Sequence, residues 1–91
     1  MDFLKISKAI ADNTRFDIFR EIIKQKEAYC GEITKSFNIS QPAISHHIKV
    51  LVEANLVIAR KEGQYIYLSV NNIVLKEYMN YLKTSFSIKK I

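Results

Sequence analysis

Four polar side chains are spaced along one short segment so that a helix would display them together: Gln41, Ser45, His46 and Lys49. Amide, hydroxyl, imidazole and ammonium groups are the donors and acceptors that contact base edges and phosphates in a DNA major groove. The same segment carries Ile44, Ile48 and Leu51 at helical spacing, so these three residues would face a core. The pattern predicts a recognition helix that is buried along one side and exposes hydrogen-bonding groups along the other.

Local chemistry marks where this helix begins. The Ser40 hydroxyl can accept a hydrogen bond from the free N–H groups of the first turn. Pro42 lies in that turn, where its missing N–H costs nothing. We therefore expect the helix to extend from Ser40 to Leu51 and include Ser40 and Pro42 in the predicted DNA-binding surface.

A recognition helix has to be positioned by a preceding helix and a short turn. Segment 32–37 follows Gly31 and is long enough for about two helical turns, and Asn38-Ile39 connects it directly to Ser40. Segments 32–37 and 40–51 together predict a helix-turn-helix. We expect three polar residues of its first helix to contact the DNA backbone: Thr34, Lys35 and Ser36.

Two further helices are predicted before this unit. Apolar residues at helical spacing predict a first helix that ends near Asp12-Asn13, with Phe3, Ile6 and Ile10 on one side. Asn13 is expected to cap a second helix that ends near Gln25 or Lys26, followed by a short extended segment at 27–30. The expected apolar stripe of the second helix consists of Phe16, Phe19, Ile22 and Ile23.

Segment 57–69 changes character, because β-branched and aromatic residues flank a charged turn that contains Gly63. It predicts a β-hairpin. The residues near its tip could contact a phosphate backbone or a minor groove, although hairpin tips are usually only solvated. Because the hairpin follows the recognition helix, we favour DNA contacts by Arg60, Lys61, Gln64 and Tyr65.

A last helix is expected from about Asn71, with an apolar stripe at spacings of three and four residues. A domain this small has few other places for a two-fold interface. The residues expected to form a homodimer lie on the first and last helices: Phe3, Ile6, Ile10, Leu75, Tyr78, Met79, Leu82 and Phe86.

Length and charge are compatible with this interpretation. The 91 residues make one small domain, 1–91, with little apolar surface for a stable monomer, so a partner subunit would help. Fourteen Lys and Arg against nine Asp and Glu give a net charge of +5, which favours a polyanionic partner. The charge alone would equally fit a solvated Lys-rich face.

Several other classes are disfavoured. Cys30 is the single cysteine and cannot form an internal disulfide. The first eight residues mix charges with apolar residues, unlike a signal peptide, and no apolar run is long enough to cross a bilayer, so we expect a cytoplasmic chain without membrane insertion. The acidic residues are scattered singly, which does not suggest an enzyme.

Three segments in this order resemble the ArsR/SmtB family of winged-helix repressors. Segment 9–18 is similar to the family's "ALADPTRxxI" pattern, with Asn13 where proline is common. Segment 40–51, followed by 53–57, resembles its recognition helix, and 60–67 resembles its wing. The resemblance implies a mainly α fold with a β-hairpin wing, in the order α-α-α-α-β-β-α. It also implies a homodimer that binds a dyad-symmetric operator in double-stranded DNA and blocks transcription.

The family's metal sites are not matched. Its thiolate site uses Cys-x-Cys, whereas this chain has Tyr29-Cys30-Gly31, and a single thiolate cannot complete a tetrahedral site. Segments 70–73 and 81–83 lack the Asp and His of the other common site. The chain most resembles the short autorepressor branch that senses no metal, so we expect no metal and no cofactor. An anti-repressor protein or a small-molecule inducer remains a possible partner.

Some residues allow two interpretations. His46 and His47 are about 100° apart on a helix and cannot chelate one ion together, so we expect His46 to face DNA and His47 to lie partly buried. Cys30 is either a small buried hydrophobic residue or, less commonly, a redox switch. For the whole chain, a winged-helix protein-interaction module and a thiol- or ligand-responsive sensor remain alternatives to a repressor.

Overall fold

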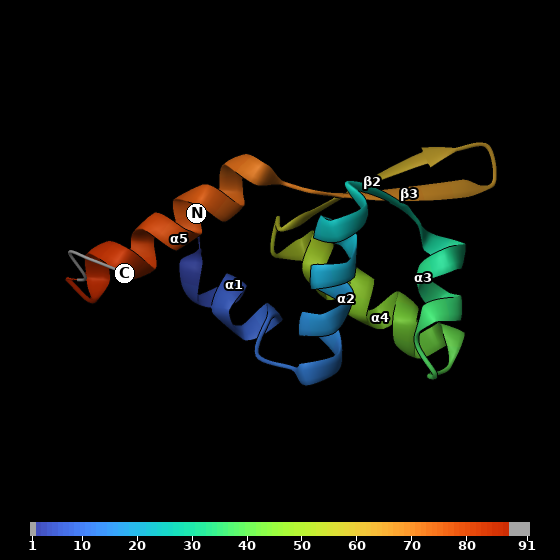
Figure 1. The fold of residues 1–91 in the computed structure, drawn as a ribbon, viewed down its shortest axis with the longest axis horizontal. Coiled ribbons are helices and arrows are strands. Elements are labelled where there is room, and N and C mark those ends of the chain that lie inside the picture. Colours follow the sequence, from blue (N-terminus) through green and yellow to red (C-terminus); the bar gives the residue numbers. More distant parts are fainter. Residues whose placement is uncertain (1, 88–91) are drawn as a thin grey trace.

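A computed structural model describes residues 2–87, which form a mainly helical fold with one small antiparallel sheet (Figure 1). The described elements follow one another as α1 (Phe3–Ala9), α2 (Asn13–Gln25), β1 (Glu27–Tyr29), α3 (Cys30–Ser36), α4 (Gln41–Glu53), β2 (Val57–Glu62), β3 (Tyr65–Val70) and α5 (Asn72–Ser85). This order confirms the predicted α+β fold with a hairpin wing. It adds one strand, because the extended segment after α2 pairs with the hairpin.

Side-chain caps begin four of the helices, since each carboxylate, hydroxyl or amide accepts from a free N–H of the first turn. Asp2, Ser40 and Asn71 do so for α1, α4 and α5. The cap of α2 is Asp12, whose Oδ2 lies 2.9 Å from the Arg15 nitrogen. The prediction that Asn13 caps α2 was therefore wrong by one residue, and α1 ends at Ala9, earlier than expected.

The core lies where α2, α4 and the inner face of the sheet meet. Its largest fully buried side chains come from all of these elements and from α1, α3 and the 54–56 connection: Ile6, Ile18, Ile22, Ile33, Ile44, Leu51, Leu56 and Leu68. On α2, Phe19 and Ile22 are buried as expected, together with Ile18. Phe16 and Ile23 are exposed, because the buried face of α2 is centred on Ile18 and Ile22.

The sheet has the strand order β1-β3-β2. Arg60 of β2 pairs with Tyr67 of β3, and Tyr67 pairs with Tyr29 of β1, so these three side chains share one face of the sheet. The hairpin turns at Gly63, whose φ of +62° lies in the left-handed region that favours glycine. One face of the sheet therefore covers the core, and the other carries tyrosines and charged groups.

Helix α5 lies at the opposite end of the long axis from the hairpin turn, beside α1 (Figure 1). The Phe3 ring stacks on Tyr81 with 4.4 Å between ring centroids, and the hydroxyls of Ser7 and Tyr78 are 2.7 Å apart. Ile6 and Tyr78 are buried within this chain, so these two predicted interface residues belong mainly to the core of the protomer. None of the helices in residues 2–87 has the length and apolar character needed to span a membrane.

Candidate nucleic-acid interface

Helix α4 is the element with the exposed polar face. The Ser40 hydroxyl accepts from the Ala43 nitrogen at 3.3 Å, and Pro42 occupies the first turn. The helix buries Ile44, Ile48 and Leu51, as the spacing predicts. Its solvent face carries the four predicted side chains, all of them exposed: Gln41, Ser45, His46 and Lys49.

Few of these polar groups have an ion-pair or hydrogen-bond partner within the described residues. Lys49 Nζ lies 3.9 Å from Glu53 Oε1, and both side chains are more than half exposed. Such an exposed pair one helical turn apart stabilises a helix by only about 0.3–0.5 kcal/mol, so it would yield readily to a phosphate. The face can therefore offer an amide, a hydroxyl, an imidazole and an ammonium group to one ligand.

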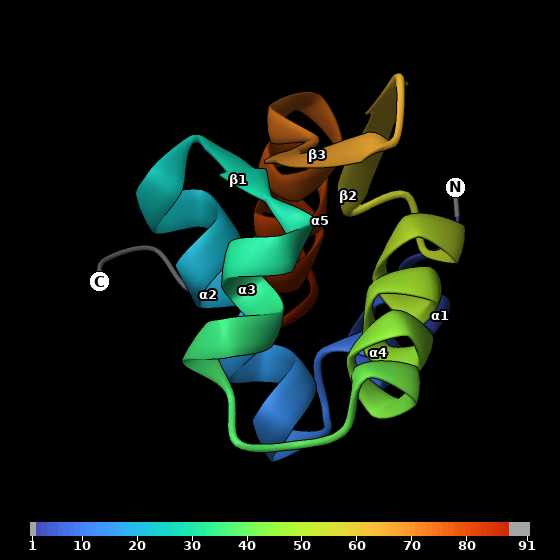
Figure 2. The same cartoon turned by 90° about the vertical axis from the view of Figure 1, so that its right-hand side faces the viewer.

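Helix α3 precedes α4, and both are seen in Figure 2, joined by the 37–40 connection. It begins at Cys30, two residues earlier than predicted. The hydroxyls of Thr34 and Ser36 donate to the carbonyls of Cys30 and Glu32 in their own helix, at 3.1 and 3.0 Å. Lys35 is exposed, and among the three residues predicted to contact the DNA backbone it alone offers a positive charge.

The wing separates its two cations onto opposite faces. Arg60 is three residues before Gly63 and forms ion pairs with Glu62 and with Glu27 of β1, at 3.1 Å for the latter. Its guanidinium carbon also lies 4.8 Å from the centre of the Tyr67 ring. Its hydrogen bonds raise the pKa of Arg60, the one to Glu62 more than the one to Glu27. Arg60 is thus already paired with two carboxylates on an exposed surface.

Lys61 points to the other face of the hairpin, because side chains alternate along a strand. It pairs with Ile66, and Ala59 lies two residues away on the same face. Ala59 and Ile66 line a groove of about 420 Å³ together with Ser45 and Lys49 of α4. The Lys61 face of the wing is therefore the one that adjoins the polar face of α4.

The two remaining predicted residues of the wing are near its turn. Gln64 follows Gly63 in the turn and is exposed. Tyr65 begins β3, where its ring meets Tyr29 edge-on with 5.4 Å between centroids. Tyr65 lies on the Arg60 face of the sheet, so its ring is directed away from the groove beside α4.

Cys30 lines the same groove between α4 and the hairpin. Its thiol is partly buried, and this burial raises its pKa. A raised pKa lowers the fraction of thiolate, which is both the nucleophile and the metal ligand. Within residues 2–87, no three His, Cys, Asp or Glu side chains lie close enough together to hold a metal ion. With one cysteine in the chain, the donors present do not fit a thiolate metal site.

A different surface lies between α2 and α5. An apolar groove of about 320 Å³ is lined there by Ile10, Phe16, Phe19, Arg20, Ile23, Leu75, Tyr78 and Met79. Met79 in this groove is 60% exposed; elsewhere Ile73 on α5 is 73% exposed, and Phe86, the C-cap of α5, is 68% exposed. Phe16 and Ile23 are surface residues, although their helical spacing places them with the buried stripe of α2.

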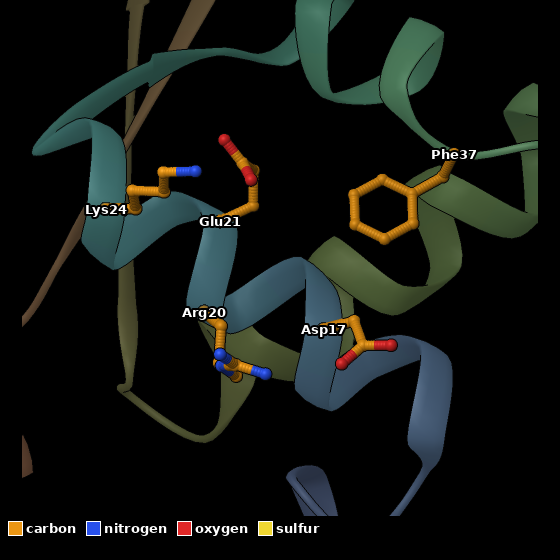
Figure 3. A pocket seen from close by; sticks show the side chains of 5 residues that line it. All are labelled: Asp17, Arg20, Glu21, Lys24 and Phe37. Carbon is orange, nitrogen blue, oxygen red and sulfur yellow. The ribbon is translucent and has the colours of Figure 1, made fainter.

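A third hollow is shown in Figure 3, on a side of α2 that faces the connection after α3. Four charged side chains of α2 and one aromatic ring line about 480 Å³: Asp17, Arg20, Glu21, Lys24 and Phe37. Two acids and two bases give this surface no net charge. It does not extend the cationic surface of α4, α3 and the wing.

Comparisons with known proteins agree with this geometry. Residues 10–59 match a family model described as a helix-turn-helix domain. The transcriptional repressor SdpR of Bacillus subtilis (strain 168) is 39% identical over 77 residues, which cover 85% of this chain and 84% of that protein. An arsenical resistance operon repressor of Staphylococcus aureus is 31% identical over 83 residues, which cover 88% of this chain and 79% of the relative.

The solved structures agree in fold. An ArsR-like transcriptional regulator from Rhodococcus sp. RHA1 superposes with a TM-score of 0.82 over 93% of this chain and 79% of that chain. At 21% identity this similarity shows the fold alone. The relatives are transcription regulators and not enzymes. The family match, the two repressors and the winged-helix architecture lead to one conclusion: the chain belongs to the ArsR family of DNA-binding winged helix-turn-helix transcriptional repressors.

Proposed function

We propose that this chain is a homodimeric repressor that inserts α4 of each protomer into one of two successive major grooves of a dyad-symmetric operator. The observation that carries the proposal is the polar face of α4, where the side chains of Gln41, Ser45 and His46 are exposed beside an apolar buried face. Direct readout by these three residues follows from their donors and acceptors. Two-fold symmetry would place the half-sites about one helical turn of DNA apart.

Contacts to the DNA backbone would come from both sides of α4. Lys35 on α3, Lys49 on α4 and Lys61 on the wing supply positive charge around the helix. Thr34, Ser36, Ser40 and Gln64 are proposed as weaker polar contacts, and Pro42 as a packing contact. The ion pairs of Arg60 and the direction of Tyr65 make these two residues the least favourable of the proposed contacts.

The dimer is proposed to form through α1, α5 and the exposed side of α2. Met79 and Phe86, seven residues apart and so on one side of the helix, leave large apolar side chains in water, and an exposed apolar surface of this kind commonly marks an interface. The other proposed members are the partly buried Phe3, Ile10, Leu75 and Leu82.

The proposed activity is binding, without metal or catalysis, and autoregulation is the proposed biological role. Such a repressor would act in the cytoplasm, where it meets DNA. An anti-repressor protein or a small molecule would relieve repression by binding the free protein better than the DNA-bound protein.

The test is fluorescence-anisotropy titration of DNA upstream of the chain's own gene, with a scrambled duplex as control and chelator present. The expected result is selective binding of two subunits per site, with affinity that falls steeply with salt because phosphate contacts release counterions. Equal, weak binding to both duplexes would contradict the proposal and favour a protein-interaction module. Binding that requires added metal would contradict metal independence alone.

A further inference from the structure

One arginine connects three helices beneath the polar face of α4. Arg15 is partly buried in the first turn of α2, and its guanidinium donates through Nε to the carbonyl of Ala9, at the end of α1. Nη2 lies 3.4 Å from the carbonyl of Lys8, also in the last turn of α1. Nη1 lies 3.1 Å from Nδ1 of His47, on α4. The planar fork of Arg15 thus contacts α1 and α4 at the same time.

The donors of Arg15 decide which nitrogen of His47 can accept a hydrogen bond in this contact. An arginine side chain has five N–H donors and no acceptor, so Nδ1 of His47 must supply a lone pair. A hydrogen bond between the two side chains therefore requires the His47 tautomer that carries its proton on Nε2. A proton on Nδ1 would direct an N–H at the Arg15 N–H and break the contact.

Three ionisable side chains surround His47. Arg15 faces it from α2, Asp12 faces it from the cap of α2, and His46 is its neighbour on α4, with ring centroids 5.9 Å apart. The backbone N–H of Arg15 holds the pKa of Asp12 below its usual value, and the charge of Arg15 acts in the same direction. Asp12 therefore balances the positive charge of Arg15.

We propose that Arg15 is a positioning residue, which sets the orientation of α4 against α1 by bonding to His47 and donating to the last carbonyls of α1. The inference rests on the proposed function, in which α1 belongs to the dimer interface and α4 to the DNA contact. In a dimer, this orientation determines the distance between the two recognition helices, and this distance has to match the half-site spacing. His46, next to His47, would be shifted by any rotation of α4.

Arg15→Gln removes the fork but keeps the backbone N–H that Asp12 caps. We expect operator affinity to fall at least tenfold, while sedimentation still shows a dimer and circular dichroism shows a folded protein. Lys24→Gln is the matched control, because it removes one exposed charge from the same helix and is expected to change affinity less than twofold. His47→Asn keeps an acceptor oxygen for Arg15 and is expected to retain affinity.

A spectroscopic readout separates positioning from a general effect on stability. The imidazole ¹⁵N shifts of the free protein at pH 8 should report Nε2–H His47 in the wild type and a mixture of tautomers in Arg15→Gln.

The possible failures are distinguishable. A wild-type protein that does not select the operator would overturn the proposed function and this inference with it. A selective wild type would overturn only the inference if Arg15→Gln bound within twofold of it, or if the His47 tautomer did not depend on Arg15. If Arg15→Gln did not fold, His47→Leu, which removes the acceptor and leaves Arg15, would serve as the second variant with the same expected loss.

Discussion

Helices α4 and α5 differ little as helices but leave very different surfaces exposed. They contain 13 and 14 residues, and each begins with a side-chain cap, Ser40 for α4 and Asn71 for α5. Helix α4 exposes polar side chains such as Gln41, whereas α5 exposes Met79 and Ile73. The same local rules build both helices, so the residues that folding leaves exposed are what indicate the partner: a polyanion for α4 and an apolar protein surface for α5.

The apolar surface of α5 is large enough to matter for association. Fully burying a side chain such as Met, Ile or Phe contributes about 1.5–3 kcal/mol. Met79 and Phe86 are each at least 60% exposed, and a symmetric dimer would bury each of them twice. Burial of these four side chains would therefore contribute roughly 4–7 kcal/mol, which lies at the lower end of the estimated cost of about 4–15 kcal/mol for association.

The largest predicted effect comes from placing a charged side chain on the exposed apolar surface of α5. Met79→Lys places a charge in the proposed interface, where a desolvated and unpaired ammonium group is costly. We expect a monomer by analytical ultracentrifugation, and operator affinity at least a hundredfold lower because each protomer then binds one half-site alone.

Asn80→Lys is the control for this variant, since it adds the same charge at the next exposed position of α5. It should remain a dimer and bind DNA as the wild type does. If the Met79→Lys protein remained dimeric at micromolar concentration, the dimer interface would have to lie elsewhere on the protein.

The second prediction removes one readout group from α4. Gln41→Ala should cost about 1–3 kcal/mol per half-site and relax discrimination between bases, since a bidentate amide contact is lost. Thermal stability should not change, because Gln41 is exposed. Anisotropy titrations against operators with single base changes measure this effect, and Asn80→Ala serves as the control amide. Unchanged discrimination would remove Gln41 from the readout.

The sequence predicts α4 well because its signals are local. Ser40, Pro42 and the spacing of Ile44 and Ile48 all lie within one segment, and helix capping and periodicity act over a few residues. The cap of α2 was misplaced by one residue because Asp12 and Asn13 are both good caps, and only the backbone conformation selects between them.

Contacts between distant segments were not predictable in the same way. Arg60 is paired with Glu27, 33 residues earlier, only because β1 joins the hairpin in one sheet. Similarly, Arg15 contacts His47 across 32 residues through the packing of α2 on α4. Residue types and spacing therefore identified candidate DNA-contacting residues, but tertiary pairing determines which cations are free.

The third prediction compares the two cations of the wing, Arg60 and Lys61. Lys61→Ala should weaken binding to all duplexes and reduce the magnitude of the salt slope by about 1 per protomer, because one phosphate contact is lost. Arg60→Ala should change the slope less, since Arg60 would have to leave Glu27 and Glu62 to contact a phosphate. Titrations at several salt concentrations compare the two variants directly. A larger effect of Arg60→Ala would mean that its ion pairs break on DNA.

The smallest predicted effect concerns Cys30, which lines the apolar groove beside Ser45 and Lys49. Burial raises the pKa of this thiol, so its thiolate fraction at pH 7.5 lies below that of a free thiol and its alkylation by iodoacetamide should be slower than that of glutathione. Cys30→Ala should bind the operator within twofold of the wild type, with or without peroxide. Cys30 would instead act as a switch if peroxide abolished DNA binding by the wild type but not by Cys30→Ala. An adduct in this groove would lie between α4 and the wing, so such a result would make the junction of the two DNA-binding elements, and not their exposed faces, the place where repression is controlled.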